Sequence, residues 1–153
     1  MKLALAQINP TIGDFPGNIR KIINRSLDGH RLGAQLVIFP ELAVCGYPPA
    51  DLLEKPSFLA QAQDALTQIA RDATSGNDLT ILCGCPTPAP AGSGKRVMNS
   101  AALLRNGSVQ FIQSKMLLPY YDVFDEQRYF APAESQSIYE LAGERIAITI
   151  CED

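Results

Sequence analysis

Three residues that could act together chemically each follow an apolar, strand-like segment of this 153-residue chain. Glu41 follows "LVIFP", Lys115 follows "VQFIQS" and Cys151 follows "IAITI". In open α/β sheets, binding and catalytic sites assemble at the ends of strands. The placement of these residues therefore predicts that one glutamate, one lysine and one cysteine converge at one edge of a sheet.

A glutamate, a lysine and a cysteine together suit acyl transfer through a cysteine nucleophile. A lysine ammonium lowers the pKa of a nearby thiol and can stabilise an oxyanion, while a carboxylate can take the thiol proton and return it to a leaving amine. His30, the only histidine, lies in a helical pattern, so a glutamate base is favoured over a histidine base. Each residue also has an ordinary structural interpretation: a buried small cysteine, a solvated glutamate and a surface lysine.

The first half of the chain alternates between strand and helix patterns. Residues 2–8 form the first predicted strand, and a helix follows with Asp14 as its N-cap and Pro16 in its first turn. Until Gly33 ends the pattern, apolar residues recur at helical spacing, namely Ile19, Ile22, Ile23 and Leu27. Residues 34–41 form a compact apolar strand, which is expected when a sheet is covered on both sides.

The second half adds another helix and an antiparallel hairpin. Ser57 is the expected cap of a helix whose apolar stripe is Leu59, Ala62, Leu66 and Ile69. Residues 78–85 form a third strand, and residues 97–115 are typical of two strands joined at Asn106-Gly107. A last strand, residues 145–150, ends at Cys151. The chain is thus predicted to be an α/β unit with a mixed sheet.

The composition limits what the chain can bind. Its net charge of −3 argues against nucleic-acid and anionic-membrane partners, which both require a basic patch. Its apolar runs are far shorter than the roughly 20 residues of a membrane span, so we expect a small-molecule partner. Four cysteines without a secretory signal indicate reduced thiols in the cytoplasm. The "CGC" at 83–85 is poor zinc spacing, so we expect no metal site and interpret Cys83 and Cys85 as packing residues.

Three segments in order resemble the signature segments of the nitrilase, or carbon–nitrogen hydrolase, superfamily: "FPELAVCGYPPADLL", "SKMLLPYYDVFDEQRYF" and "ITICED". Within that superfamily, "GYPPADLL" and "VFDEQRYF" are similar to the amino-terminal glutaminase domain of glutamine-dependent NAD synthetases. The similarity extends over the whole chain, from "KLALAQINPTIGDFPGN" to "CED". The sequence departs from the family pattern at Tyr120, where asparagine is frequent, and at Ala50, where an acidic residue is frequent.

This resemblance implies a role for each candidate residue. Glu41 would be the general base, Lys115 the oxyanion and charge stabiliser, Cys151 the nucleophile that forms a thioester, and Tyr121 a contact of the substrate glutamine. The implied fold is a nitrilase-like α-β-β-α sandwich with mixed sheets. Residues 1–153 would be the N-terminal portion of this domain, truncated just after the nucleophile, and we expect this fragment alone to be inactive.

The resemblance also implies a division of labour. Such enzymes hydrolyse L-glutamine and send the ammonia to a second, ATP-using synthetase domain in cis, which amidates deamido-NAD. Residues 1–153 contain no glycine-rich phosphate loop, so ATP and magnesium are expected only in that absent domain and no cofactor is expected here. The full-length form is expected to be a cytoplasmic homo-oligomer. Two alternatives stay open: a stand-alone nitrilase-family amidase, and a non-catalytic fragment or interaction module.

Overall fold

The computed structural model describes residues 1–153 and contains one mixed sheet with the strand order β1-β2-β3-β4-β5. The first three strands are parallel neighbours, whereas β4 runs antiparallel to both β3 and β5. Their bounds are Leu3–Leu5, Leu36–Ile38, Thr80–Pro88, Val97–Arg105 and Ser108–Ser114. The predicted mixed sheet is therefore confirmed, although β1 and β2 are shorter than the predicted segments.

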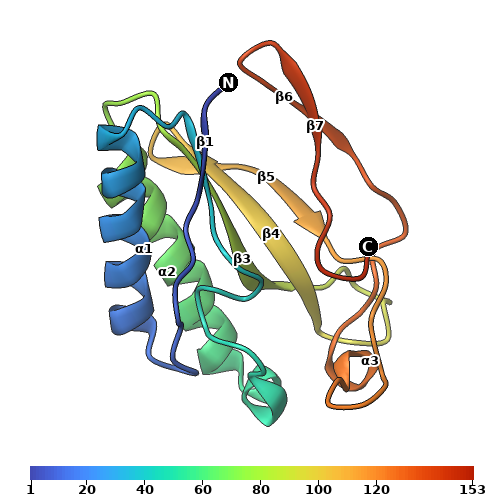
Figure 1. The fold of residues 1–153 in the computed structure, drawn as a ribbon. Helices are drawn as coiled ribbons and strands as arrows, with labels where there is room; N and C mark the ends of the chain where they lie inside the picture. Colours follow the sequence, from blue (N-terminus) through green and yellow to red (C-terminus); the bar gives the residue numbers. More distant parts are fainter.

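Two long helices cover the same face of this sheet, as Figure 1 shows. They are α1, Phe15–Arg31, and α2, Pro56–Thr74. The carboxylate of Asp14 accepts a hydrogen bond from the Gly17 backbone at 3.0 Å, which confirms the predicted N-cap of α1. The predicted cap of α2 is wrong, because Ser57 lies inside the first turn. Lys55 occupies the N-cap position without a side-chain hydrogen bond, and Pro56 begins the helix.

The face that α1 turns to the sheet differs from the predicted stripe at its C-terminal end. Ile19 and Ile22 are buried as expected, but Leu27 is 36% exposed. Ser26 and Gly29 are buried instead. A β-carbon on Gly29 would lie 2.8 Å from the Val37 side chain, so the helix approaches β2 too closely there for a larger residue.

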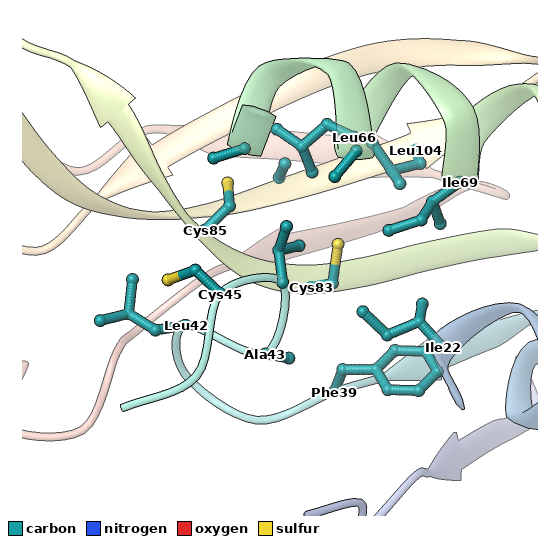
Figure 2. Close-up of a cluster of buried hydrophobic side chains, with 14 of the residues drawn as sticks. Ile22, Phe39, Leu42, Ala43, Cys45, Leu66, Ile69, Cys83, Cys85 and Leu104 are labelled. Carbon is teal, nitrogen blue, oxygen red and sulfur yellow. The ribbon is translucent and has the colours of Figure 1, made fainter. Parts of the chain in front are cut away.

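The core lies between the helices and the sheet, and three of the four cysteines belong to it. Cys45, Cys83 and Cys85 have no exposed surface, and Figure 2 shows Cys83 and Cys85 pointing from β3 towards α2. Residues two apart in a strand share a face, which explains this common direction. Burial raises the pKa of both Cys45 and Cys83 to about 12, so they are neutral packing groups. The full burial of Cys83 and Cys85 confirms that both are packing residues.

The hairpin between β4 and β5 turns where the sequence predicts. Asn106 and Gly107 both have positive φ, 51° and 75°. A two-residue turn whose two central residues have positive φ matches the twist of the flanking strands, and Asn-Gly adopts it readily.

Several short elements lie outside the main sheet. These are η1, a 3-10 helix at Ala50–Glu54 earlier in the chain, α3 at Glu126–Tyr129, and the strands β6, Ile138–Leu141, and β7, Glu144–Ala147. The β6–β7 hairpin lies on the side of the sheet opposite the two long helices (Figure 1). None of the helices combines the length and apolar character that a membrane crossing needs.

The predicted last strand is only partly present. It was expected at residues 145–150, but β7 ends at Ala147 and pairs with β6 alone. The next apolar residues, Ile148 and Ile150, are buried in a small cluster with Ala101 of β4. Cys151 therefore follows an irregular segment that packs on the sheet, not the end of a strand.

Candidate active site

The ammonium of Lys115 lies between two carboxylates in the interior of the molecule. Lys115 comes directly after β5, and its side chain has no exposed surface. Its Nζ lies 2.8 Å from Glu41 Oε1 and 3.0 Å from Glu126 Oε2. A charge can be buried at low cost only when it is paired and hydrogen-bonded, as it is here. Glu126 presents both of its oxygens to the ammonium, since Nζ also donates to Glu126 Oε1 at 3.1 Å.

Glu41 reaches this position because its backbone runs alongside β3 beyond the end of β2. Phe39 N donates to Leu82 O at 2.9 Å, and Val44 N donates to Gly84 O at 3.1 Å. A β-carbon on Gly84 would lie 2.2 Å from Leu42 N and 2.8 Å from Glu41 Cα. Glycine at position 84 thus permits the close approach that places Glu41 next to Lys115.

Cys151 lies in a turn with an unusual backbone conformation. Its φ is 53°, in the left-handed region, and Leu42, next to Glu41, has a φ of 49°. Such conformations are costly for residues other than glycine and gather at functional sites. The residue is exposed. Glu41 and Lys115 hydrogen-bond each other, and the thiol of Cys151 is bonded to neither of them.

The Asp153 carboxylate ties the Cys151 turn to the segment that follows Lys115. Its Oδ1 accepts hydrogen bonds from the backbone N–H groups of Met116 and Leu117, each at 2.8 Å. Its Oδ2 accepts from Ile150 N at 3.1 Å. Two of these donors belong to the segment after Lys115 and the third belongs to the Cys151 turn, so the carboxylate holds the turn beside the lysine.

The charges of Glu41 and Lys115 both reach the thiol of Cys151. Its partial burial raises the pKa, the Glu41 carboxylate raises it further, and Lys115 lowers it, with a net pKa above the ordinary value. Lys115 thus lowers the pKa of the thiol, as the sequence predicts, but burial and the nearby carboxylates outweigh the lysine charge and keep the net pKa above the ordinary value. The resting cysteine is a thiol, so nucleophilic attack requires a base.

Lys115 itself stays protonated. Burial acts to lower its pKa, but the hydrogen bonds and charges of Glu41 and Glu126 outweigh burial and raise the pKa above its ordinary value of 10.5. A raised lysine pKa means that the stabilisation is fully present below the ordinary value and is lost as pH rises through the folded-state pKa. The ion pairs therefore persist across the neutral range.

The cluster around Lys115 also contains Tyr47, Asn99 and Glu126, which the sequence pattern did not single out. Tyr47 donates from its hydroxyl to Glu126 Oε1 at 3.0 Å, and Asn99 Nδ2 donates to Glu41 Oε1 at 2.6 Å. Burial and the Glu126 charge raise the pKa of Tyr47, which keeps its hydroxyl proton. A polar residue inside the apolar β4 segment was a usable signal for Asn99. Nothing in residue type separates Glu126 from Asp125 beside it.

Tyr121 lies on the surface beside the Cys151 turn. Its hydroxyl donates to the Glu152 carboxylate, and its ring meets the Phe124 ring edge-on with centroids 5.7 Å apart. A pocket of about 610 Å³ adjoins them, and its lining includes Met116, Leu117, Tyr120, Tyr121 and Glu152. This volume is in the range of small-molecule sites. His30, by contrast, lies near the end of α1 with its Nδ1 3.9 Å from Asp78.

Comparison with known proteins matches almost every residue of the chain. The family model described as carbon-nitrogen hydrolase matches residues 2–153. A glutamine-dependent NAD(+) synthetase from Synechocystis sp. is 44% identical over 154 residues, which cover 99% of this chain and 27% of that relative. The chain thus spans about a quarter of the length of the curated relatives it matches.

Two solved structures share the fold. A glutamine-dependent NAD+ synthetase from Acinetobacter baumannii, in complex with ADP, is 36% identical with a TM-score of 0.88, and the match covers 99% of this chain and 27% of that one. A variant amidase from Nesterenkonia sp. AN1, to whose active-site cysteine acrylamide has added, is 25% identical with a TM-score of 0.78. That match covers 97% of this chain and 56% of the amidase. The predicted α/β fold is confirmed.

Proposed function

The chain belongs to the carbon–nitrogen hydrolase family, whose nitrilase-like fold it shares, and from this premise we propose that it forms part of a glutamine amidohydrolase within a glutamine-dependent NAD synthetase. One observation carries the proposal: a buried Lys115 paired with Glu41 and Glu126 lies near the exposed Cys151. Such an arrangement supplies a base, a positive charge and a nucleophile for acyl transfer. The 44% identity to a glutamine-dependent relative supports glutamine as the acyl donor.

In the first step, Cys151 Sγ attacks the side-chain carboxamide carbon of L-glutamine. Glu41 takes the thiol proton as the S–C bond forms, because the raised pKa of Cys151 keeps the resting group protonated. The carbonyl oxygen becomes an oxyanion. The positive charge of the Lys115 ammonium stabilises this oxyanion, while Glu41 and Glu126 hold the lysine in place.

In the second half of the reaction, the tetrahedral intermediate collapses and its C–N bond breaks. Glu41 returns the proton to the departing nitrogen, so ammonia leaves and a γ-glutamyl thioester remains on Cys151. Glu41 then takes a proton from water, which attacks the thioester. Glutamate leaves as Cys151 regains its thiol, so the atoms and protons of glutamine hydrolysis balance. Tyr121, at the adjoining pocket, is our proposed contact for the substrate.

The match to about a quarter of longer relatives also supports a proposal for the whole protein. We infer that residues 1–153 are the N-terminal portion of the hydrolase domain and that a synthetase domain in cis uses the ammonia to amidate deamido-NAD. We assign ATP and magnesium to that second domain. We place the protein in the cytoplasm, since its four cysteines are free, and expect the full-length form to be a homo-oligomer.

A second candidate is a stand-alone amidase. The Nesterenkonia amidase supports it, because that protein shares the fold and the chain covers 56% of its length. The Glu41, Lys115 and Cys151 chemistry would be the same, but ammonia would be released to solvent. The two candidates also differ in substrate range, because a glutaminase is selective for glutamine and a stand-alone amidase is expected to accept simpler amides.

Ammonia release from a panel of amides separates these candidates. In the full-length protein that carries residues 1–153, we expect kcat/KM for L-glutamine to exceed that for propionamide by at least about 100-fold, because a site built for the α-ammonium and α-carboxylate of glutamine binds the bare amide poorly. Comparable values for the two amides would favour the stand-alone amidase. Absence of hydrolysis with every amide would contradict hydrolase activity.

A further inference from the structure

We propose that Asn99 is a positioning residue that holds one carboxylate oxygen of Glu41 and leaves the other to accept the cysteine proton. This inference rests on the proposed function of the site. It concerns a residue that makes no contact with substrate, because Asn99 is completely buried within β4, behind Glu41.

Asn99 contacts both Glu41 and Lys115. Its side-chain Nδ2 donates to Glu41 Oε1 at 2.6 Å, and its backbone carbonyl accepts from Lys115 N at 2.8 Å. In the sheet register, Asn99 lies opposite Pro86 of β3, two residues after the Gly84 that admits the Glu41 backbone. One fully buried residue of β4 therefore fixes the base by its side chain and the lysine by its backbone.

The hydrogen bonds make the two oxygens of Glu41 unequal. Oε1 accepts from Lys115 Nζ at 2.8 Å and from Asn99 Nδ2 at 2.6 Å. Neither donor contacts Oε2, whose lone pairs remain free to accept a proton. A general base must be held in place without blocking the atom that receives the proton. The structure therefore assigns proton transfer to Oε2 and the anchoring role to Oε1.

The other end of the Asn99 amide supports this assignment. Its Oδ1 is buried and has no hydrogen-bond partner. A buried polar atom without a partner is unfavourable and calls for an explanation. The present Nδ2 faces both Glu41 Oε1 and, at 3.5 Å, Glu126 Oε2. If the amide were rotated by half a turn, Oδ1 would take this place, and both carboxylates would repel it. The two carboxylates thus fix the donor orientation of the amide although the oxygen is left unpaired.

The test is the Asn99→Asp substitution, which keeps the shape but replaces the NH₂ donor by an acceptor. Four groups face Glu41 besides Asn99: Lys115 after β5, Glu126 of α3, Tyr47 in the same loop and Cys151 in its turn. The substitution adds a third carboxylate beside Glu41 and Glu126, which already share the one ammonium of Lys115. Glu41 would lose a donor that stabilises its ionised form and gain a nearby negative charge.

We expect kcat for glutamine hydrolysis by the full-length protein to fall by about 10- to 100-fold in Asn99→Asp, the usual range for one charge-assisted hydrogen bond. KM should change little. The acidic limb of the pH–rate profile should move to higher pH, because Glu41 would stay protonated further up the pH scale. Asn106→Asp is the matched control, since the same chemical change occurs in an exposed turn. It should leave both kcat and the profile unchanged.

A folded Asn99→Asp variant with the wild-type kcat and acidic limb would overturn the inference. If that variant does not fold, Asn99→Ala decides, because it removes the donor without adding charge, and we expect the same direction of change in kcat. If both variants lose thermal stability but the acidic limb does not move, the role of Asn99 is purely structural and the proposal is overturned. Failure of both variants to fold would overturn it as well. A wild-type protein that hydrolyses no glutamine would instead reject the proposed function, and this inference with it.

Discussion

Replacing Cys151 by alanine is expected to abolish NAD formation from glutamine in the full-length protein and to leave NAD formation from ammonium salt intact. The substitution removes the sulfur that would carry the glutamyl group, whereas ammonia supplied from solution bypasses that step. The residue is exposed in its turn, so alanine creates no core cavity. NAD should be measured with each nitrogen source at saturating ATP and deamido-NAD.

The matched control is Thr149→Ala, which truncates an exposed side chain two residues earlier in the same segment. It should retain both activities. Loss of both activities in Cys151→Ala would mean that the cysteine is structural or that the two sites cannot be separated. Retention of the glutamine-driven activity would exclude Cys151 as the nucleophile.

Glu41→Gln is expected to slow thioester formation by about 10²- to 10⁴-fold, the typical contribution of a general base. The amide oxygen can still accept from Lys115 and Asn99, so the cluster around the lysine should remain assembled. The variant cannot take the thiol proton, however. Single-turnover release of ammonia measures the step directly, and glutamine affinity should be close to wild type.

Glu54→Gln is the matched control for this substitution, because Glu54 is an exposed glutamate in η1. We expect it to retain the wild-type rate. If a folded Glu41→Gln variant kept a rate within about threefold of wild type, the fall in rate would be far smaller than the least that a lost base should cause. Another group would then have to take the proton.

The parts of the fold that depend on local pattern could be predicted from the sequence. Asp14 caps α1 because its short carboxylate reaches the first free N–H groups, and Asn106-Gly107 forms a turn because both residues tolerate positive φ. The apolar character of the "CGC" segment indicated packing for Cys83, and burial confirms it. Each of these outcomes is decided by residues within a few positions of one another.

The parts that depend on long-range packing could not be predicted. Alternation of apolar residues predicted a strand up to Ile150, but Ile148 and Ile150 satisfy the same alternation by packing on Ala101 without strand pairing. Leu27 has the spacing of a core residue, yet the close approach of α1 to β2 at Gly29 leaves it at the rim. Both differences depend on how closely two elements pack against each other, and the periodicity of apolar residues does not predict that distance.

For the candidate site, the sequence pointed to Glu41 and Lys115, which lie in contact, but it did not predict the electrostatic balance. The pKa of Cys151 depends first on burial of the thiol and then on the charges of one lysine and several carboxylates. One of these carboxylates, Glu126, lies 11 positions after Lys115 in a short helix. Residue types alone indicated a lysine that favours thiolate. Burial of the thiol, and after it the nearby carboxylates, outweigh the effect of the lysine.

The most direct measurement of the central claim, that Cys151 is the nucleophile of a glutaminase, is the mass of cysteine-containing peptides after incubation with a diazoketone analogue of glutamine. We expect one adduct on the peptide of Cys151 in the full-length protein, and protection of that peptide by excess glutamine. The other three cysteines, Cys45, Cys83 and Cys85, are buried and should stay unmodified. Modification at any of these three in place of Cys151, or labelling of Cys151 that glutamine does not reduce, would contradict the account.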